Sequence, residues 1–391
     1  MSLGNSYSNS SILVYKSYGG IGDIFFTLPS LYMLKQKFNK VTYATQPRLV
    51  HLFSKHLDGI EVVSEDEVDE SLYDEVIELG NYPKFSNDLE KQPQITYHTH
   101  KKVKQHAIEH YKDGIISKFP DIVKSNERYP YFEQIETDEL YYTVHPGAGF
   151  LLKAWPVEYY ARLIEIIHDK FPELKVKIII GPNDPNPESL FSSENLKYEL
   201  ITGDIDEVAE TVSGAFFHIG NDAGMTHLAG AFNIPILTIY GPTGPGSWGA
   251  FSEHVELIWG KRGNCGQRCN YNVILACEDR VCLNNVSPQK MMFLLLRLLK
   301  RIGTQPSFVF QLNPDFDYTM DDKAVIFKSK DNEYLIDIHD SKSYQFIEEN
   351  LQENTIDTEH MPKQFMEIFD ALIQLELFEP LPKILALKHS L

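Results

Sequence analysis

The sequence lacks the long apolar runs and the leader pattern of membrane-inserted or exported proteins. None of its hydrophobic stretches reaches the roughly 18 residues that a membrane-spanning helix needs. Residues 1–11 are polar and rich in serine and asparagine, with no basic start followed by an apolar stretch. We therefore expect a cytoplasmic protein that is not an integral membrane protein.

Positive charge is also in short supply. The 36 lysines and arginines face 55 aspartates and glutamates, so the formal net charge is −19. A field of this sign disfavours non-specific binding to nucleic acids and anionic lipids, and we expect no nucleic-acid partner. Residues 304–391 hold 17 acidic and 7 basic side chains, so their net charge is −10 and they account for about half of the excess.

Segment 98–112 has the opposite character. It carries four lysines and four histidines against one glutamate. Such a cluster is typical both of a site for an anionic ligand and of a solvated helix face, and the sequence leaves both interpretations open.

Cysteine is confined to one short segment. The four cysteines have the spacing C-x3-C-x7-C-x4-C and are Cys265, Cys269, Cys277 and Cys282. Four thiolates this close in sequence can hold zinc or iron in a tetrahedral site, whereas disulfides are disfavoured in a reducing compartment. The alternatives are a structural metal site, far from any catalysis, and free thiols.

The chain is rich, by contrast, in short apolar runs that alternate with helical patterns, over 391 residues without a low-complexity tract. The expected strands are 12–15, 41–44, 75–79, 141–145, 176–180, 200–201, 216–219 and 236–240, and the expected helices are 24–34, 157–171, 207–213 and 225–232. This alternation predicts an α/β fold with parallel sheets covered on both faces. We expect two Rossmann-like domains, residues 11–140 and 141–302, that face a cleft lined by the polar region 81–131.

The end of the chain has a different pattern. An apolar helix is expected over 287–302, long enough to cross back onto the first domain. Residues 307–391 predict a separate small α+β module. Its hairpin is expected at 324–327 and 333–337, and its helices at 341–349, 362–375 and 383–387.

The candidate phosphate site is segment 220–231, where a strand ends in a turn that opens a helix. The first backbone N–H groups of a helix have no internal partner and attract anions. Gly224 permits close approach of a ligand, and Thr226 and His227 can add hydrogen-bond donors. Asp222 is expected to cap the helix. The alternative is an ordinary capped helix in an α/β sheet.

Three more turns follow expected strands or open helices. Loop 241–248 and loop 145–156 lie at the edge of the second sheet where ligands of parallel sheets bind. Lys153 in the second of these loops can meet a diphosphate as a point charge. Asp23, in the glycine-rich turn 19–23, is either a helix cap or a general base facing the cleft.

The ordered set of residues 19–29, 145–156 and 221–243 resembles family 9 glycosyltransferases, which include ADP-heptose:lipopolysaccharide heptosyltransferases. The resemblance covers about residues 11–302. It implies a GT-B fold and an inverting transfer without a catalytic metal, with Asp23 as the general base and Lys153 stabilising the leaving diphosphate. It implies that the donor, an ADP-sugar, is bound by Gly22, Asp222, Gly224, Met225, Thr226 and His227.

Several points stay open within this resemblance. Ala223 and Met225-Thr226 depart from many relatives, which leaves the sugar undetermined. An anionic acceptor, such as lipopolysaccharide core at the inner membrane, is expected at His98, Lys101, Lys102 and Lys104. Residues 323–378 resemble the PqqD-like peptide-binding fold, so a protein or peptide acceptor is an alternative. A non-catalytic nucleotide-sugar-binding protein is another, and a homo-oligomer is compatible with the sequence.

Overall fold

The structure is a computed structural model. It describes residues 10–16, 19–80, 95–96, 105–128, 132–260, 277, 280–302, 309–321, 323–352, 354–357, 361–375 and 377–380. The chain forms two compact units. One comprises residues 1–155, 176–186 and 198–283, and the other comprises residues 156–175, 187–197 and 284–391. The boundaries expected at residues 140 and 302 stay predictions.

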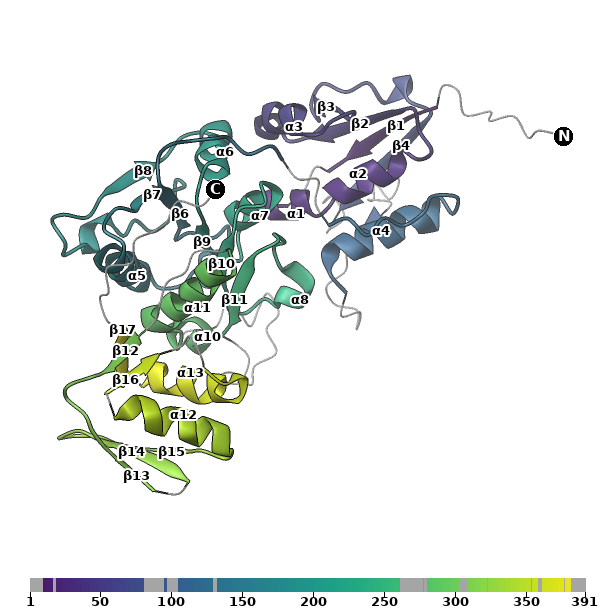
Figure 1. Ribbon diagram of the computed structural model, residues 1–391. Helices are drawn as coiled ribbons and strands as arrows, with labels where there is room; N and C mark the ends of the chain where they lie inside the picture. Colours follow the sequence, from purple (N-terminus) through teal and green to yellow (C-terminus); the bar gives the residue numbers. More distant parts are fainter. Residues whose placement is uncertain are drawn as a thin grey trace. The chain divides into compact units, whose positions relative to one another are not determined.

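The first unit contains a parallel sheet of five strands in the order β3-β2-β1-β4-β5 (Figure 1). The strands are β1 (Ser11–Tyr15), β2 (Lys40–Thr45), β3 (Glu61–Ser64), β4 (Glu75–Gly80) and β5 (Ile95–Thr96). The central strand β1 is the expected apolar run, and its residues 12–14 are wholly buried. Strand β5 lies within the polar region 81–131, where no strand was predicted, because two residues are too few to produce an alternating pattern.

Two short helices follow β1 in place of the one helix expected there. They are α1 (Ile21–Phe25) and α2 (Leu28–Leu34). Pro29 lies at the start of α2 and has no N–H to donate to the carbonyl four residues earlier. The hydroxyl of Thr27 donates instead to the carbonyl of Ile24 at 2.7 Å, which closes the first helix. The apolar spacing continues across the break because both helices bury the same face.

The first unit also contains the helices α3 (Val50–His56) and α4 (Ala107–Lys118) and the 3-10 turns η1 (Pro47–Leu49) and η2 (Glu70–Leu72). Helix α4 packs against α2. The N-cap of α4 is His106, whose Nδ1 accepts the backbone N–H of Ile108 at 3.2 Å. This bond fixes the start of α4, which lies within the polar region 81–131.

The same unit holds a second parallel sheet, of six strands in the order β11-β10-β9-β6-β7-β8. The strands are β6 (Tyr141–His145), β7 (Lys175–Ile179), β8 (Tyr198–Ile201), β9 (His218–Asn221), β10 (Ile236–Tyr240) and β11 (Val255–Trp259). The parallel pairing confirms the fold class. The sequence prediction missed β3 and β11, which are edge strands of the two sheets, because an edge strand is half exposed and its apolar run is interrupted.

Two helices of the second sheet agree with the expected ones, α6 (Ile205–Ser213) and α7 (Gly224–Ala231). The short helices α8 (Pro245–Trp248) and α10 (Val281–Asn284) and the 3-10 turn η4 (Leu151–Lys153) were not predicted. Helix α6 begins where the carboxylate of Asp204 accepts the N–H groups of Asp206 and Glu207.

The second unit is built on two long helices that the sequence predicted to within one residue. They are α5 (Val157–Lys170) and α11 (Pro288–Arg301), and α11 packs against both α5 and α13 (Met366–Gln374). Ser287 caps α11 through the N–H of Lys290. The 3-10 turn η5 (Glu188–Leu190) belongs to this unit too.

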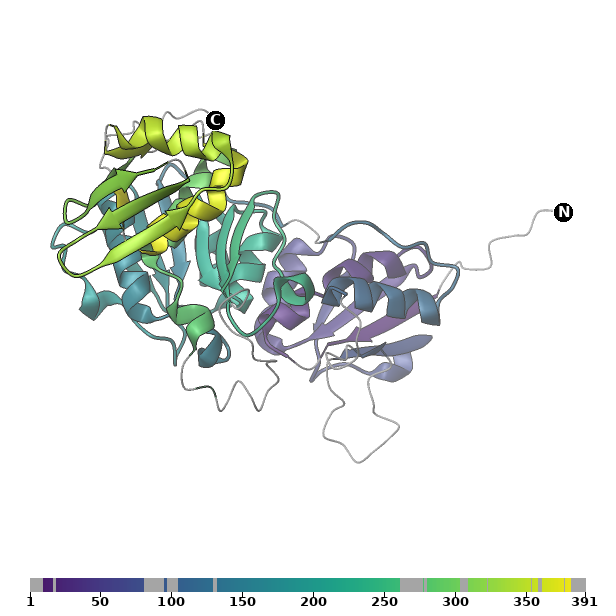
Figure 2. The same cartoon turned by 90° about the horizontal axis from the view of Figure 1, so that it is seen from below.

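The C-terminal module is α+β, as expected. Its antiparallel sheets are β16-β12-β17 and β13-β14-β15 (Figure 2). The strands are β12 (Val309–Leu312), β13 (Asp317–Met320), β14 (Ala324–Lys328), β15 (Glu333–Asp337), β16 (Thr355–Asp357) and β17 (Phe378–Pro380). The predicted hairpin is β14 and β15, in which Val325 pairs with Ile336. Helix α12 (Ser341–Leu351) and the turn η7 (Lys363–Phe365) leading into α13 match the predicted helices, whereas 383–387 lies outside the described residues.

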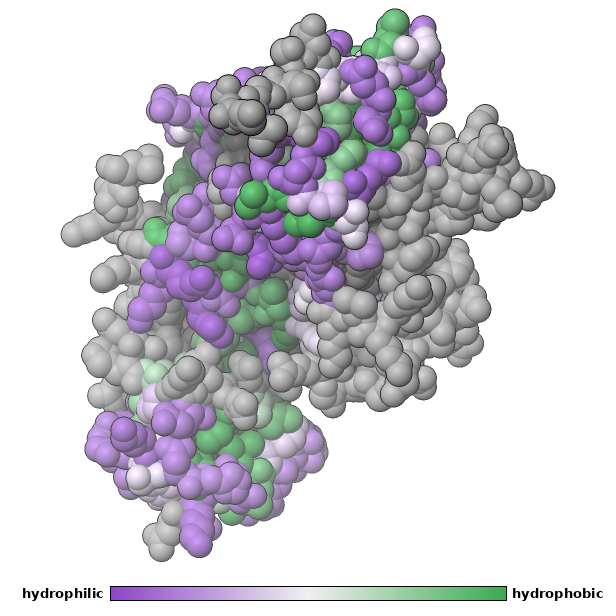
Figure 3. Space-filling view, turned by 90° about the vertical axis from the view of Figure 1, so that its right-hand side faces the viewer, coloured by the Kyte–Doolittle hydropathy of each residue, from purple (hydrophilic) through white to green (hydrophobic). Residues whose placement is uncertain are grey.

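The surface of the module mixes apolar and polar side chains. Apolar atoms lie among hydrophilic ones at the lower end of Figure 3, where the module is found. Leu335 on β15 is 60 % exposed, the most exposed large hydrophobic of the described module. In the part of the chain that the structure describes, no helix is both long and apolar enough to cross a membrane.

Candidate functional site

Helices α1 and α7 lie side by side (Figure 1), and a glycine near the start of each lies at the contact. A Cβ placed on Gly22 would lie 2.7 Å from Cδ2 of His227, and one on Gly224 would lie 2.9 Å from Cβ of Ile21. Contacts this short would force the neighbouring side chain to shift, so glycine is the residue that fits at either position without displacing its neighbour. The turn that carries Asp23 therefore lies directly against the turn predicted to hold phosphate.

Asp222 does not cap α7, and that prediction was wrong. The N-cap is Ala223, and no side chain caps the helix. The carboxylate of Asp222 is 6 % exposed, and its Oδ2 accepts from Lys153 Nζ at 3.0 Å and from Thr243 Oγ1 at 2.6 Å. Loops 145–156 and 241–248 thus converge on Asp222, as their position after neighbouring strands predicted.

The three residues after Gly224 differ in what they offer a ligand. The hydroxyl of Thr226 is wholly buried and donates to the carbonyl of Asn221 at 2.6 Å, so it is not free to donate to a phosphate as expected. His227 is buried edge-on against Phe26, with ring centroids 4.7 Å apart. Burial lowers the pKa of His227 to about 4, so its ring is neutral near pH 7. Met225 is half-buried against the apolar core.

Asp23 takes the capping position in its turn. Its Oδ2 accepts the backbone N–H of Gly20 at 3.0 Å, in the third position of α1. Lys16, at the end of β1, is wholly buried, and its Nζ has no hydrogen-bond partner within the described ranges. Burial lowers the pKa of Lys16 to about 8, against the opposing charges of Asp23 and Glu78. Lys16 was not predicted as a site residue, although a lysine directly after a buried strand is a usable signal.

More polar groups gather at the same edge of the second sheet. His145 Nε2 lies 2.9 Å from Asp184 Oδ2, which also accepts the N–H of Gly181 at 2.9 Å. A Cβ on Gly147 would overlap the Asp184 carboxyl group, so glycine is needed there too. Burial raises the pKa of Asp184, but the hydrogen bond and charge of His145 together with the N–H of Gly181 outweigh it, so the net pKa is below the usual range.

The basic segment 98–112 is only partly described. His98, Lys101, Lys102 and Lys104, the predicted acceptor residues, lie outside the described residues. In the described part, Lys112 is wholly buried and donates to the carbonyls of Ser125 and Glu127. His106 is buried too, and its Nε2 lies 3.0 Å from the carbonyl of Gly249. The side chains of Lys112 and His106 are therefore bonded to backbone carbonyls. They form neither a solvated face nor an open anion site.

Two of the four cysteines are described. Cys282 is buried on α10 and Cys277 is half-buried, while Cys265 and Cys269 lie outside the described residues. Within the described ranges, no three histidine, cysteine or acidic side chains group as metal ligands. The metal site therefore stays a prediction.

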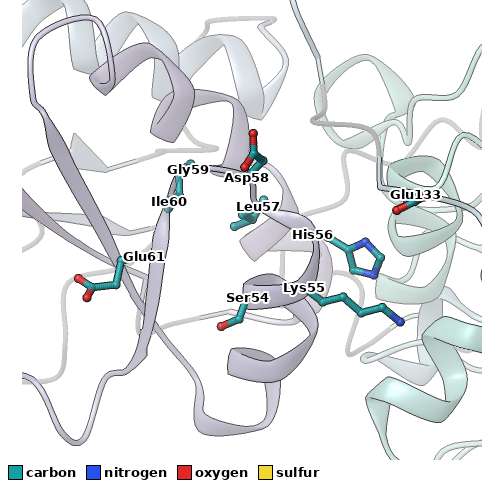
Figure 4. Close-up of a pocket in the computed structure, with 9 residues that line it drawn as sticks. All are labelled: Ser54, Lys55, His56, Leu57, Asp58, Gly59, Ile60, Glu61 and Glu133. Atoms are coloured by element: carbon teal, nitrogen blue, oxygen red, sulfur yellow. The ribbon is translucent and has the colours of Figure 1, made fainter.

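A surface cavity of about 540 Å³ lies elsewhere in the first unit (Figure 4). It is lined by Ser54, Lys55, His56, Leu57, Asp58, Gly59, Ile60, Glu61 and Glu133. The His56 ring stacks on Phe132 at 4.7 Å. The lining mixes both signs of charge and includes none of the predicted donor residues, so we do not assign the chemistry to this cavity.

A family of known enzymes matches the middle of the chain. Residues 84–275 match the model of glycosyltransferase family 9 (heptosyltransferase). Lipopolysaccharide heptosyltransferase 1 of Escherichia coli K12 is 28 % identical over 114 residues, which are 29 % of this chain and 35 % of that protein. The matched region thus spans about a third of that relative's length.

Solved structures share the fold. E. coli ADP-heptose lps heptosyltransferase II has a TM-score of 0.57 at 17 % identity, over 75 % of this chain and 99 % of that one. The iron-containing dodecameric glycosyltransferase TibC from enterotoxigenic E. coli has a TM-score of 0.55 at 11 % identity, over 75 % of this chain and 77 % of that one.

Proposed function

We propose that the chain is a member of glycosyltransferase family 9 and transfers a sugar from a nucleoside diphosphate donor to a saccharide acceptor. Its fold is the GT-B fold, with two Rossmann-like domains and a C-terminal module. One observation carries the proposal. The glycine contact between α1 and α7 brings the turn of Asp23 beside the turn where Lys153, Asp222 and Thr243 converge.

The second sheet would bind the donor. Lys153 is held 3.0 Å from Asp222, and an ammonium has three N–H donors, so others remain for a diphosphate oxygen. The backbone N–H groups at the start of α7 add positive potential at the same place. Thr243 donates to Asp222 as well, and the ammonium of Lys153 offsets the charge of this carboxylate.

Asp23 would act as the general base. In an inverting displacement, the acceptor hydroxyl attacks the anomeric carbon, Asp23 takes its proton, and the bond to the diphosphate breaks with its electron pair. The leaving diphosphate then gains negative charge, which Lys153 and the start of α7 stabilise. One base and one cationic site suffice for this step.

We propose a heptose as the sugar and ADP as the nucleotide, because the relatives named above are heptosyltransferases and one is named for ADP-heptose. Lipopolysaccharide core is the proposed acceptor for the same reason. A protein acceptor and a non-catalytic role have no supporting observation among the described residues. A cysteine-bound metal and a homo-oligomer are further proposals, since TibC is named as iron-containing and dodecameric.

The base is tested with Asp23→Asn. Asparagine keeps an oxygen that accepts the Gly20 N–H, so the turn is preserved while basicity is lost. We expect sugar transfer from ADP-heptose to fall by about 10²–10⁴-fold. Asp204→Asn, which alters the capping carboxylate of α6, is the matched control and should transfer sugar at the wild-type rate. An unchanged rate in Asp23→Asn would remove Asp23 as the base.

The donor site is tested by calorimetric titration with ADP and UDP and their sugars. Lys153→Ala should weaken binding of the preferred nucleotide at least tenfold. Lys55→Ala, at a lysine whose side chain is 51 % exposed, is the control and should bind normally. Absence of binding to any nucleotide by the wild-type protein would overturn the assignment of the donor site.

A further inference from the structure

Asn221, the last residue of β9, is a buried side chain with an unusual set of partners. It is 0 % exposed. Its Nδ2 donates to the carbonyls of Pro146 and Gly147, each at 2.9 Å, and its Oδ1 accepts the backbone N–H of Trp155 at 2.9 Å. One amide group thus satisfies three backbone groups that lie 66 to 75 residues away in sequence.

These three backbone groups are the two ends of a single loop. Pro146 and Gly147 follow β6, and Trp155 ends the loop two residues after Lys153. Inside the loop, the N–H of Lys153 donates to the carbonyl of Phe150 at 2.8 Å, which closes the turn η4. The amide of Asn221 therefore joins the two ends and fixes the loop that carries Lys153.

Asp222, the neighbour of Asn221, holds the other end of the lysine. Its Oδ2 accepts from Lys153 Nζ at 3.0 Å. The backbone of Lys153 is thus set through Asn221 and its ammonium through Asp222, and both come from consecutive residues at the end of β9. A shift of the loop relative to that strand end would separate Lys153 from Asp222.

We propose that Asn221 is a positioning residue that places the Lys153 ammonium for the leaving diphosphate. The inference rests on the proposed function. It makes Asn221 act through Lys153 and not on the substrate, because all three of its bonds go to the loop backbone.

The chemistry of the amide explains why asparagine is needed. Nδ2 supplies two donors and Oδ1 an acceptor, and the loop uses all three. An ionised aspartate has no donor, so the substitution Asn221→Asp, of nearly equal size, sets a carboxylate against two carbonyl oxygens. A buried acceptor left without its donor is costly, and the loop is expected to move away.

The first experiment is a double-mutant cycle with Lys153→Ala. We expect Asn221→Asp to lower kcat for sugar transfer by about 10–100-fold, since a displacement of about 1 Å can cost 10²-fold. In the Lys153→Ala background, the same change should lower kcat less than about twofold, because the group that it misplaces is already gone. Equal factors in both backgrounds would mean a merely structural role and would overturn the proposal.

The second experiment needs no activity. Acylation of each lysine by an amine-reactive reagent at fixed pH is measured by mass spectrometry, with Lys55 as the internal reference. Lys153 should label several-fold faster in Asn221→Asp than in the wild type. Unchanged labelling in a folded variant would overturn the proposal. If the wild type binds no nucleotide but labelling of Lys153 still changes, the proposed function fails. The positioning of Lys153 by Asn221 is then still supported.

Asn221→Ser keeps the design falsifiable if the aspartate variant does not fold. A serine hydroxyl can donate to one carbonyl, so this substitution removes part of the three hydrogen bonds of Asn221 and places no carboxylate against the carbonyl oxygens. We expect an intermediate loss of kcat and intermediate labelling of Lys153. A folded serine variant with wild-type kcat and wild-type labelling would refute the role of Asn221.

Discussion

His218, on β9, is a wholly buried imidazole whose charge the fold disfavours. Its Nδ1 lies 3.0 Å from Oγ1 of Thr143, and its Nε2 has no hydrogen-bond partner among the described residues. A Cβ on Gly220 would lie 2.7 Å from that nitrogen, so the glycine leaves room for the ring. Burial, aided by the charge of His145, lowers the pKa of His218 to about 3.

The sign of the pH effect follows from this lowered pKa. Unfolded histidine takes up its proton near pH 6.5, whereas folded His218 does so near pH 3. Between these values the unfolded chain binds more protons, so the free energy of unfolding falls as the pH falls. The two pKa values give a loss of about 2 kcal/mol at pH 5 relative to pH 8, and about 5 kcal/mol below pH 3.

Urea unfolding of the wild type and His218→Gln at pH 8 and pH 5, followed by circular dichroism, tests this reasoning. Glutamine can keep a hydrogen bond to Thr143 and does not titrate. Between pH 8 and pH 5, the free energy of unfolding of the variant should fall by about 2 kcal/mol less than that of the wild type. His51→Gln, at a histidine whose side chain is 76 % exposed, should follow the wild type. A variant that loses as much as the wild type would refute the reasoning.

Three further predictions concern buried groups. Burial lowers the pKa of Lys16 to about 8, so wild-type stability should rise by about 3 kcal/mol between pH 8 and 10.5, and Lys16→Met should lack this rise in urea unfolding. Gly22→Ala should displace His227 and cost about 1–3 kcal/mol, whereas Gly246→Ala, with nothing within 4 Å, should be as stable as the wild type. Leu228→Ala should cost about 2–5 kcal/mol, because Leu228 is wholly buried on α7, and a smaller cost would indicate that the site collapses.

Element type and order were predictable because they are local. The apolar run of β1 and the helical spacings of α5 and α11 reflect burial of one face, and both appear in the amino-acid order itself. The gap between α1 and α2 was not predicted, since both helices bury the same face and the spacing continues across the break. The edge strands β3 and β11 were missed because half-exposed strands mix apolar and polar residues.

The segments of the candidate site could be named from the sequence, whereas the partners of their side chains could not. The sequence located loops after neighbouring parallel strands, and topology alone brings such loops to one edge. It assigned Asp222 to a cap and Thr226 to a ligand, because a turn residue before a helix is most often its cap. The structure gives both side chains other partners, Lys153 and Asn221.

The sequence by itself thus determined the α/β class, the order of the elements, the C-terminal module and the segments that make up the candidate site. Tertiary structure decided which side chains meet. Lys153 and Asp222 are 69 residues apart, and Asn221 and Pro146 are 75 apart, so no local pattern links them. Periodicity records whether a residue is buried, whereas a hydrogen-bond partner depends on the register of strands and the path of loops, which exist only after the chain has folded.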